Sequence, residues 1–240
     1  MVRLFADYKI EENAEFSLNK EDSRYISSVL RMREGEELTV VDADGFEVLA
    51  QVASLSKDEV VLHAVSKSRN ETESPCKITL YQSISKGERM DLTIQKSVEL
   101  GVYRIVPVYS SRCVAKPGKE SKIDRWQKIA LEAARQCNRG IIPEVASPVS
   151  FKEALQAAKD NDLMLFPWEE EKGRSLKQVI DNTSPESVAV FIGPEGGFSE
   201  EEASLASNAG CTHVTLGKRI LRTETAGPAV LAMLLYHIEL

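Results

Sequence analysis

One short stretch constrains the fold more than any other: five apolar residues, Val188–Ile192, followed at once by a glycine-rich turn at 193–197. The run is too short for a helix and is apolar on both faces, so it predicts a buried strand of a parallel sheet. Ser199 and Glu202 then form the pattern of a capping box, which predicts that a helix begins there. A passage from strand through turn to helix forms the crevice in which open α/β sheets bind ligands.

Two further stretches repeat this pattern. Residues 212–216 predict a strand that leads into Gly217 and a polar loop, and a long apolar helix follows at 229–236. Residues 163–166 predict another strand, followed by Pro167 and Trp168. The loops match neither the Gly-Lys-Ser/Thr of a P-loop nor the G-x-G-x-x-G of a dinucleotide fold. From the residues alone, both ordinary tight turns and a ligand site stay open.

The sequences of these loops resemble a known signature. IGPEGGFSEEE at 192–202 and LGKRILRTETA at 216–226 resemble the SPOUT, or α/β-knot, methyltransferases, and their form is most similar to the RsmE family. Further similar segments are VLRMREGE at 29–36, the segment 86–108 and the segment 125–145, so the resemblance covers nearly the whole chain. That family methylates N3 of a uridine in 16S (small-subunit) ribosomal RNA.

The resemblance implies a two-domain architecture. We expect an α/β protein: a SPOUT trefoil-knot methyltransferase domain at 75–240, preceded by a small PUA-like β-barrel RNA-binding domain at 1–70. The residues support this division, because three strand-like runs joined by short turns follow a short helix near the N-terminus, as in a small barrel. From residue 77 onward, predicted strands alternate with helices, which indicates a mostly parallel sheet. A polar segment that ends in Pro75, residues 67–75, is the predicted linker.

The same resemblance implies S-adenosyl-L-methionine (AdoMet) as the methyl donor, bound by the three loops. Glycine lets backbone groups approach a ligand closely, and aliphatic neighbours can wall an adenine ring. The predicted cofactor-binding residues are Leu165, Phe166, Ile192, Gly193, Pro194, Gly196, Gly197, Leu216, Gly217, Ile220, Leu221, Arg222, Thr225 and Ala226.

The chemistry of the acceptor suggests catalytic candidates. N3 of uracil carries a proton at neutral pH, so methyl transfer needs that proton lost or the developing anion stabilised. Arg139 and Arg222 are the candidate cations, and Glu195 and Glu224 are candidate proton acceptors. Which residue acts as the base stays open, and positioning alone could suffice.

Basic residues provide candidate phosphate contacts, although the net charge of the chain is −7. An acidic total lowers the expectation of RNA binding without excluding a local basic patch. The candidates are Arg3, Arg31, Arg33, Lys116 and Arg125. Tyr25 stands where the family usually has a histidine, which leaves the role of that side chain open.

Other patterns exclude some classes of protein. The four cysteines are widely spaced and no histidines have metal-ligand spacing, so we expect no metal and reduced thiols. No apolar run approaches the ~20 residues of a membrane span. We therefore expect a cytoplasmic protein. The resemblance implies a homodimer whose partner is 16S rRNA or the assembled small ribosomal subunit.

Two alternatives stay open at this stage. One is a SPOUT enzyme for another target, such as tRNA or a ribose 2′-hydroxyl. The other is a non-catalytic RNA-binding protein that keeps the barrel and an inert knot. Intact glycine loops favour an enzyme, because a pure binding protein has no need of a methyl-donor pocket.

Overall fold

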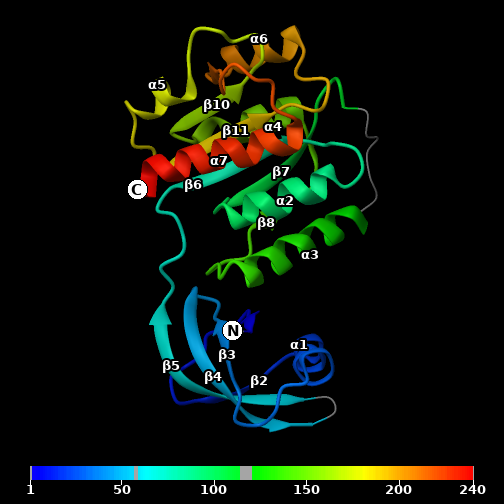
Figure 1. The fold of residues 1–240 in the computed structure, drawn as a ribbon, viewed down its shortest axis with the longest axis vertical. Coiled ribbons are helices and arrows are strands. Elements are labelled where there is room, and N and C mark those ends of the chain that lie inside the picture. Colours follow the sequence, from blue (N-terminus) through cyan, green and yellow to red (C-terminus); the bar gives the residue numbers. More distant parts are fainter. Residues whose placement is uncertain (1, 57–58, 114–120, 240) are drawn as a thin grey trace. The chain divides into compact units, whose positions relative to one another are not determined.

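The computed structural model describes residues 2–56, 59–113 and 121–239. These residues form two compact units (Figure 1). The first comprises Met1–Glu73 together with Ala134–Ile141, and the second comprises Ser74–Ala133 and Ile142–Leu240. The sequence-based division assigned 134–141 to the second domain, whereas the structure groups this segment with the first unit. Residues 134–141 contact residues of the first unit that are distant in sequence, and no local sequence pattern reveals such contacts.

The first unit is built on a five-stranded sheet with the strand order β1-β3-β4-β5-β2. The pairing is antiparallel except between β1 and β3, which run parallel. Alternate residues of the long strands face a core that includes Val48, Val52 and Leu62. The strands are β1 (Arg3–Phe5), β2 (Glu15–Ser17), β3 (Glu37–Val41), β4 (Phe46–Leu55) and β5 (Val60–Arg69). Because β5 continues to Arg69, the linker begins later than the predicted residue 67.

A short helix lies between β2 and β3. The Asn19 side chain accepts a hydrogen bond from Asp22 N–H and starts α1 (Lys20–Arg24), the short helix that the sequence predicts near the N-terminus. The chain continues as a π-helical segment, Tyr25–Leu30, and ends at Arg31 in the left-handed conformation with φ 54°. The half-buried Tyr25 ring lies 5.3 Å from the Arg135 guanidinium, a cation–π contact within the first unit. Tyr25 therefore has a structural partner.

The second unit is a parallel α/β domain, as the alternating pattern predicts. Its sheet has the order β12-β10-β11-β6-β7-β8, and β9 also pairs with β7. Every pairing in it is parallel. The strands are β6 (Lys77–Ser83), β7 (Arg104–Tyr109), β8 (Glu144–Val145), β9 (Val149–Ser150), β10 (Leu163–Pro167), β11 (Ser187–Ile192) and β12 (Thr212–Val214).

Helices cover both faces of this sheet (Figure 1). Helices α2 and α7 pack against each other, and α7 also contacts β6 and β11. Helices α4 and α6 contribute to a separate core cluster with Phe166 and Phe191 of the sheet. The helices are α2 (Arg89–Glu99), α3 (Ser121–Gln136), α4 (Phe151–Ala157), α5 (Leu176–Ile180), α6 (Glu200–Asn208) and α7 (Thr223–Glu239).

The capping box predicted at Ser199 forms, and another helix begins in the same way. Ser150 caps α4 with Glu153, and Ser199 caps α6 with Glu202. Gly210 follows α6 with φ +97°, the left-handed conformation expected after a helix end. None of the helices among the described residues is both long enough and apolar enough to span a membrane.

Candidate active site

The three predicted loops meet at one edge of the second unit's sheet. Strand β10 lies between β11 and β12 and runs parallel to both. The carboxyl ends of neighbouring parallel strands lie at the same edge, so the segments that follow the three strands converge there. The glycine turn predicted from the apolar run 188–192 is thus placed beside the loop that follows β12.

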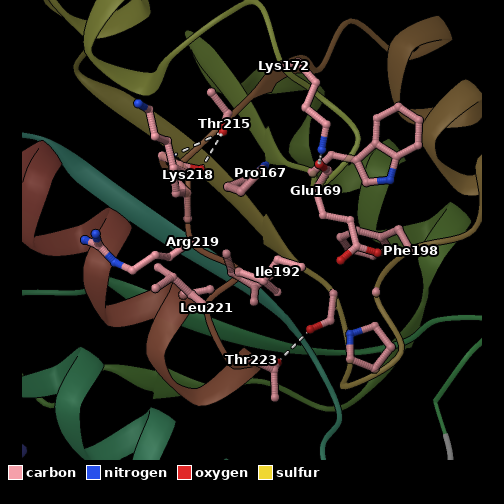
Figure 2. A pocket seen from close by; sticks show the side chains of 18 residues that line it. Pro167, Glu169, Lys172, Ile192, Phe198, Thr215, Lys218, Arg219, Leu221 and Thr223 are labelled. Atoms are coloured by element: carbon pink, nitrogen blue, oxygen red, sulfur yellow. Dashed lines mark hydrogen bonds between the residues drawn. The ribbon is translucent and has the colours of Figure 1, made fainter.

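A cavity of about 360 Å³ opens between these loops (Figure 2). Its size is in the range of small-molecule sites, which run from ~300 to 1,000 Å³. Apolar side chains form much of the wall, and charged groups lie at several points of it. The lining residues are Pro167, Trp168, Glu169, Lys172, Ile192, Gly193, Pro194, Gly197, Phe198, Thr215, Leu216, Gly217, Lys218, Arg219, Ile220, Leu221, Thr223 and Ala226.

Most of the predicted cofactor-binding residues line this cavity. They are Ile192, Gly193, Pro194, Gly197, Leu216, Gly217, Ile220, Leu221 and Ala226. Five others do not line it: Leu165, Phe166, Gly196, Arg222 and Thr225. Leu165 and Phe166 are completely buried within the sheet, and the next two residues of the chain, Pro167 and Trp168, take the lining positions. The lining at the end of β10 thus begins two residues after the predicted pair, whose role in cofactor binding stays a prediction.

Two glycines are required by the geometry of the cavity. Gly217 has φ +116°, which L side chains rarely adopt, and a Cβ atom there would meet nothing within 4 Å. That open space belongs to the cavity that Gly217 lines. At Gly193, a Cβ would lie 3.2 Å from both the ring and the backbone nitrogen of Phe198, so a side chain there would have to displace Phe198 by a few tenths of an ångström.

Sequence reasoning missed several lining residues. The charged ones are Glu169, Lys172, Lys218 and Arg219. Glu169 and Lys172 follow β10 in an irregular segment, and the Lys172 ammonium donates to the backbone carbonyl of Glu169. The Glu169 carboxylate lies toward the glycine turn, within 3.2 Å of where a Cβ of Gly197 would stand (Figure 2). The only sequence feature that indicates these four charged residues is their position just after a predicted strand.

An ion-pair cluster holds the glycine turn from outside the cavity. The Arg89 guanidinium contacts the Glu195 carboxylate at 2.7 Å and the Glu224 carboxylate at 3.6 Å. Lys86 N–H also donates to Glu195, at 3.1 Å. Partial burial opposes ionisation of Glu195, but these hydrogen bonds outweigh burial and lower the Glu195 pKa. A carboxylate stabilised in its charged form is a weaker proton acceptor.

A second arginine supports the same turn. Arg112 donates from its guanidinium to the carbonyl oxygen of Gly196 at 2.9 Å. Its neighbour Ser111 donates from both its backbone and its hydroxyl to Glu202, which is also half of the capping box of α6. The turn is therefore held by α2, by the segment after β7 and by the helix that it starts.

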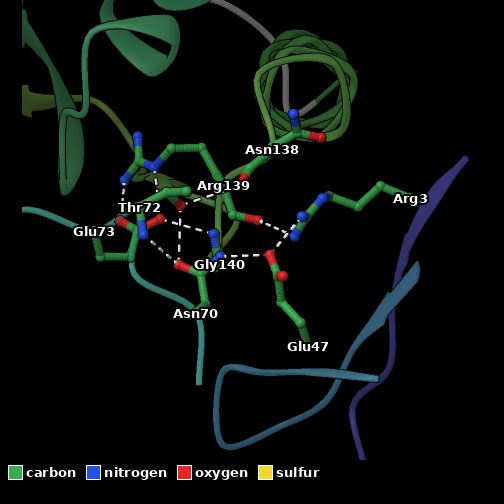
Figure 3. A network of polar contacts seen from close by, with 8 residues as sticks. All are labelled: Arg3, Glu47, Asn70, Thr72, Glu73, Asn138, Arg139 and Gly140. Carbon is green, nitrogen blue, oxygen red and sulfur yellow. Dashed lines mark hydrogen bonds and ion pairs between the residues drawn. The ribbon is translucent and has the colours of Figure 1, made fainter. Parts of the chain in front are cut away.

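Arg139 belongs to the first unit, where it forms a buried ion pair (Figure 3). Its guanidinium is 3% exposed and binds both oxygens of Glu73, at 2.8 and 2.7 Å. Gly140 N–H donates to Glu73 as well, and the carbonyl of Arg139 accepts from the Arg3 guanidinium at 3.0 Å. These contacts give Arg139 a structural role, and its catalytic role stays a prediction.

Four of the five predicted RNA-binding residues lie among the residues that the structure describes. Arg31 and Arg33 are exposed on the first unit, and Arg125 is exposed on α3, where it pairs with Asp91. Arg3 is buried and engaged with Glu47 and the carbonyl of Arg139, and its phosphate contact stays a prediction.

Lys116 lies outside the described residues. The Arg222 side chain is exposed, while its carbonyl accepts from the N–H groups of Thr225 and Ala226 at the start of α7. Within the described ranges, no group of three or more His, Cys, Asp or Glu residues could hold a metal ion.

Comparison with known proteins places this arrangement in a family. The sequence matches the RNA methyltransferase domain family over residues 72–235 and the RNA methyltransferase PUA domain family over residues 18–65. It is 34% identical to Ribosomal RNA small subunit methyltransferase E of Bacillus subtilis (strain 168), covering 97% of this chain and 94% of that protein.

Solved structures agree with the sequence comparison. A Ribosomal RNA small subunit methyltransferase E from Neisseria gonorrhoeae, bound to S-adenosyl methionine, superposes with a TM-score of 0.88 at 36% identity, covering 98% of this chain and 97% of that one. A Legionella pneumophila protein, in complex with the bound cofactor SAM, gives 0.89 at 37% identity with the same coverage. The fold is therefore that of the SPOUT methyltransferases with a PUA-like N-terminal domain, and the chain belongs to the Ribosomal RNA small subunit methyltransferase E family.

Proposed function

We propose that this protein transfers a methyl group from AdoMet to N3 of a specific uridine in 16S ribosomal RNA. The observation that carries the proposal is the cavity between the loops after β10, β11 and β12, in a chain whose relatives are small-subunit rRNA methyltransferases. The choice of N3 rests on the resemblance of the segment 216–226 to the RsmE signature. The compartment that this function implies is the cytoplasm.

The cavity suits AdoMet in size and chemistry. Ile192, Leu216 and Leu221 offer apolar walls for an adenine ring, and the glycines at 193 and 217 expose backbone groups for its polar edge. AdoMet carries positive charge on its sulfonium and its amino group, and the Glu169 carboxylate in the wall is the matching anion. When bound, AdoMet supplies an electrophilic methyl group.

The chain's own residues handle orientation and charge. Loops on three neighbouring strands fix a bound ligand against a rigid sheet, and such positioning alone gives large rate gains. The exposed Arg222, next to the cavity-lining Leu221, is our candidate for stabilising negative charge on the uracil ring. Arg139 and Glu195 are already held in ion pairs, so the proposal assigns them structural roles.

A second copy of the chain is the partner that we propose for α7. Its residues Val230, Leu231 and Leu234 are buried in the core, while Met233 and Tyr236 on the other side are 41% and 72% exposed. A groove of about 540 Å³ between α5 and α7 includes these two side chains. Exposed apolar surface of this kind is typical of an interaction site.

Light scattering tests the dimer. We expect a dimer for the wild type at micromolar concentration and a monomer for Tyr236→Glu. The control Tyr103→Glu, which changes an exposed tyrosine elsewhere in the second unit, should leave the dimer intact. A monomeric wild type contradicts the proposal.

Methyl transfer from labelled AdoMet tests the reaction. The acceptors are unmodified small subunits, naked 16S rRNA and bulk tRNA. Label in the subunits or in 16S rRNA supports the proposed substrate. Label in tRNA alone moves the function to another SPOUT target, and failure of both transfer and AdoMet binding favours a non-catalytic RNA-binding protein.

A further inference from the structure

A short chain of buried hydrogen bonds connects three elements behind the cavity. Gln82 on β6 donates from its amide nitrogen to the hydroxyl of Thr223 at 2.9 Å. The Thr223 hydroxyl in turn donates to the carbonyl oxygen of Gly193 at 2.6 Å (Figure 2). Gln82 and Thr223 are both buried, and Thr223 and Gly193 both line the cavity. The chain thus joins the sheet, the first residue of α7 and the glycine turn.

The direction of each hydrogen bond follows from the groups involved. A backbone carbonyl can only accept, so the single proton of the Thr223 hydroxyl must point to Gly193. The hydroxyl then has only lone pairs for Gln82, which must present its N–H rather than its oxygen. This requirement fixes the orientation of the Gln82 amide, and its nitrogen also donates to the carbonyl of Ser83.

The arrangement leaves one buried polar atom unsatisfied. Among the described residues, the side-chain oxygen of Gln82 has no hydrogen-bond partner. An apolar residue at this position in the sheet would avoid that cost. Core stability therefore does not account for a buried glutamine at this position. Its hydrogen bond to the Thr223 hydroxyl does account for it.

The other contacts to the turn come from more exposed side chains. Arg89 reaches Glu195 and Arg112 reaches Gly196, and both arginines lie outside the lining of the cavity. Thr223 alone among these three anchoring side chains lines the cavity itself. Its bond to Gly193 sets the orientation of the peptide group that links two lining residues, Gly193 and Pro194.

We propose that Thr223 is a positioning residue for the methyl donor, with Gln82 orienting its hydroxyl. The hydroxyl holds the peptide group after Gly193 in the orientation that the donor binds, and it connects the glycine turn to the start of α7. The proposal rests on the proposed function, because it assigns the cavity to AdoMet. The proposal predicts that removing the hydroxyl lowers the affinity for AdoMet, with a smaller effect on the free energy of unfolding.

Calorimetric titration of AdoMet into the full chain tests this inference. Thr223→Val keeps the branched shape and removes the hydroxyl, and we expect its Kd to rise about tenfold, as the loss of one or two net hydrogen bonds implies. Thr223→Ser keeps the hydroxyl and should restore most of the affinity. Methyl transfer should show a raised KM for AdoMet with a nearly unchanged kcat at saturation.

Two further variants complete the design. Ser23→Ala removes a buried hydroxyl that donates to the carbonyl of Leu18 in the first unit, whose residues do not line the cavity, and should leave the Kd unchanged. Gln82→Met removes the donor to Thr223 and should raise the Kd two- to threefold, which keeps the inference testable if Thr223→Val does not fold.

The outcomes distinguish the positioning role of Thr223 from the proposed function. Wild-type affinity in folded Thr223→Val, or an equal loss in Thr223→Val and Thr223→Ser, overturns the positioning role alone. A wild-type protein that binds no AdoMet overturns the proposed function and this inference with it. A tenfold loss that serine restores supports both.

Discussion

Replacing Arg139 by methionine tests the role of the buried ion pair in the first unit. The change removes the guanidinium and keeps an unbranched stem of similar bulk. Glu73 then loses two charge-assisted hydrogen bonds, of 2.8 and 2.7 Å, and keeps only the bond from Gly140 N–H among these three. Removing one partner of a buried ion pair costs ~3–5 kcal/mol.

The expected magnitude lies at the lower end of that range. The Glu73 side chain is 27% exposed, so water can partly replace the lost guanidinium. We therefore expect Arg139→Met to lower the free energy of unfolding by about 3 kcal/mol. For a protein of this size, ~1 kcal/mol shifts Tm by ~2–4 °C, so the expected shift is about 6–12 °C.

Urea titration and thermal unfolding followed by circular dichroism measure the effect. The matched control is Arg125→Met, because Arg125 is 65% exposed and its pair with Asp91 should be worth ~1 kcal/mol or less. The double variant Arg139→Met/Glu73→Met should recover part of the stability, since neither charge is then left alone.

One pattern of results refutes this reasoning. If Arg139→Met unfolds with the wild-type midpoint and yet loses methyl transfer, Arg139 acts in catalysis and the structural assignment is wrong. Transfer that falls only in step with the folded fraction supports the structural role.

Two more predictions concern other buried or strained positions. The buried Asp42 accepts from Lys67 and three backbone N–H groups, so Asp42→Asn should cost ~2–4 kcal/mol in urea titration at pH 7. Burial opposes ionisation of Asp42, but these donors outweigh it and lower the Asp42 pKa, so its contribution is fully present above pH ~4 and shrinks as the pH falls from there through the lowered pKa. A cost that is no smaller at pH 3 than at pH 7 contradicts this. Gly217→Val should abolish AdoMet binding, because the side chain enters the cavity at φ +116°. Gly35→Val, at φ +86° with similar open space but in the first unit, should cost a comparable ~1–3 kcal/mol of strain and keep binding, so equal binding losses in the two variants would point to strain alone.

The features that local sequence determines were predictable. Asn19, Ser150 and Ser199 start helices because a capping side chain acts within three residues of itself. The strand at 188–192 was recognisable because a run that is apolar on both faces must be buried on both faces. The loops that form the cavity followed from these strands and from the resemblance.

The features that depend on distant contacts were not predictable. Arg139 and Glu73 are 66 residues apart in sequence, and Thr223 and Gln82 are 141 apart. Periodicity carries no information about such pairs. The lining of the cavity by Pro167 and Trp168 in place of Leu165 and Phe166 depends on where β10 leaves the sheet, and strand ends are the least predictable part of an element.

The measurement that tests the central claim most directly is identification of the methylated nucleoside in unmodified small ribosomal subunits after reaction with the protein and labelled AdoMet. Nucleoside mass spectrometry distinguishes a base-methylated uridine from a ribose-methylated one, and a reverse-transcription stop locates it, because methylation at N3 blocks the pairing edge of uracil. The account predicts one N3-methyluridine at a single position, lost in Gly217→Val. Label on a ribose, on several scattered uridines, or on no nucleoside despite AdoMet binding would contradict it.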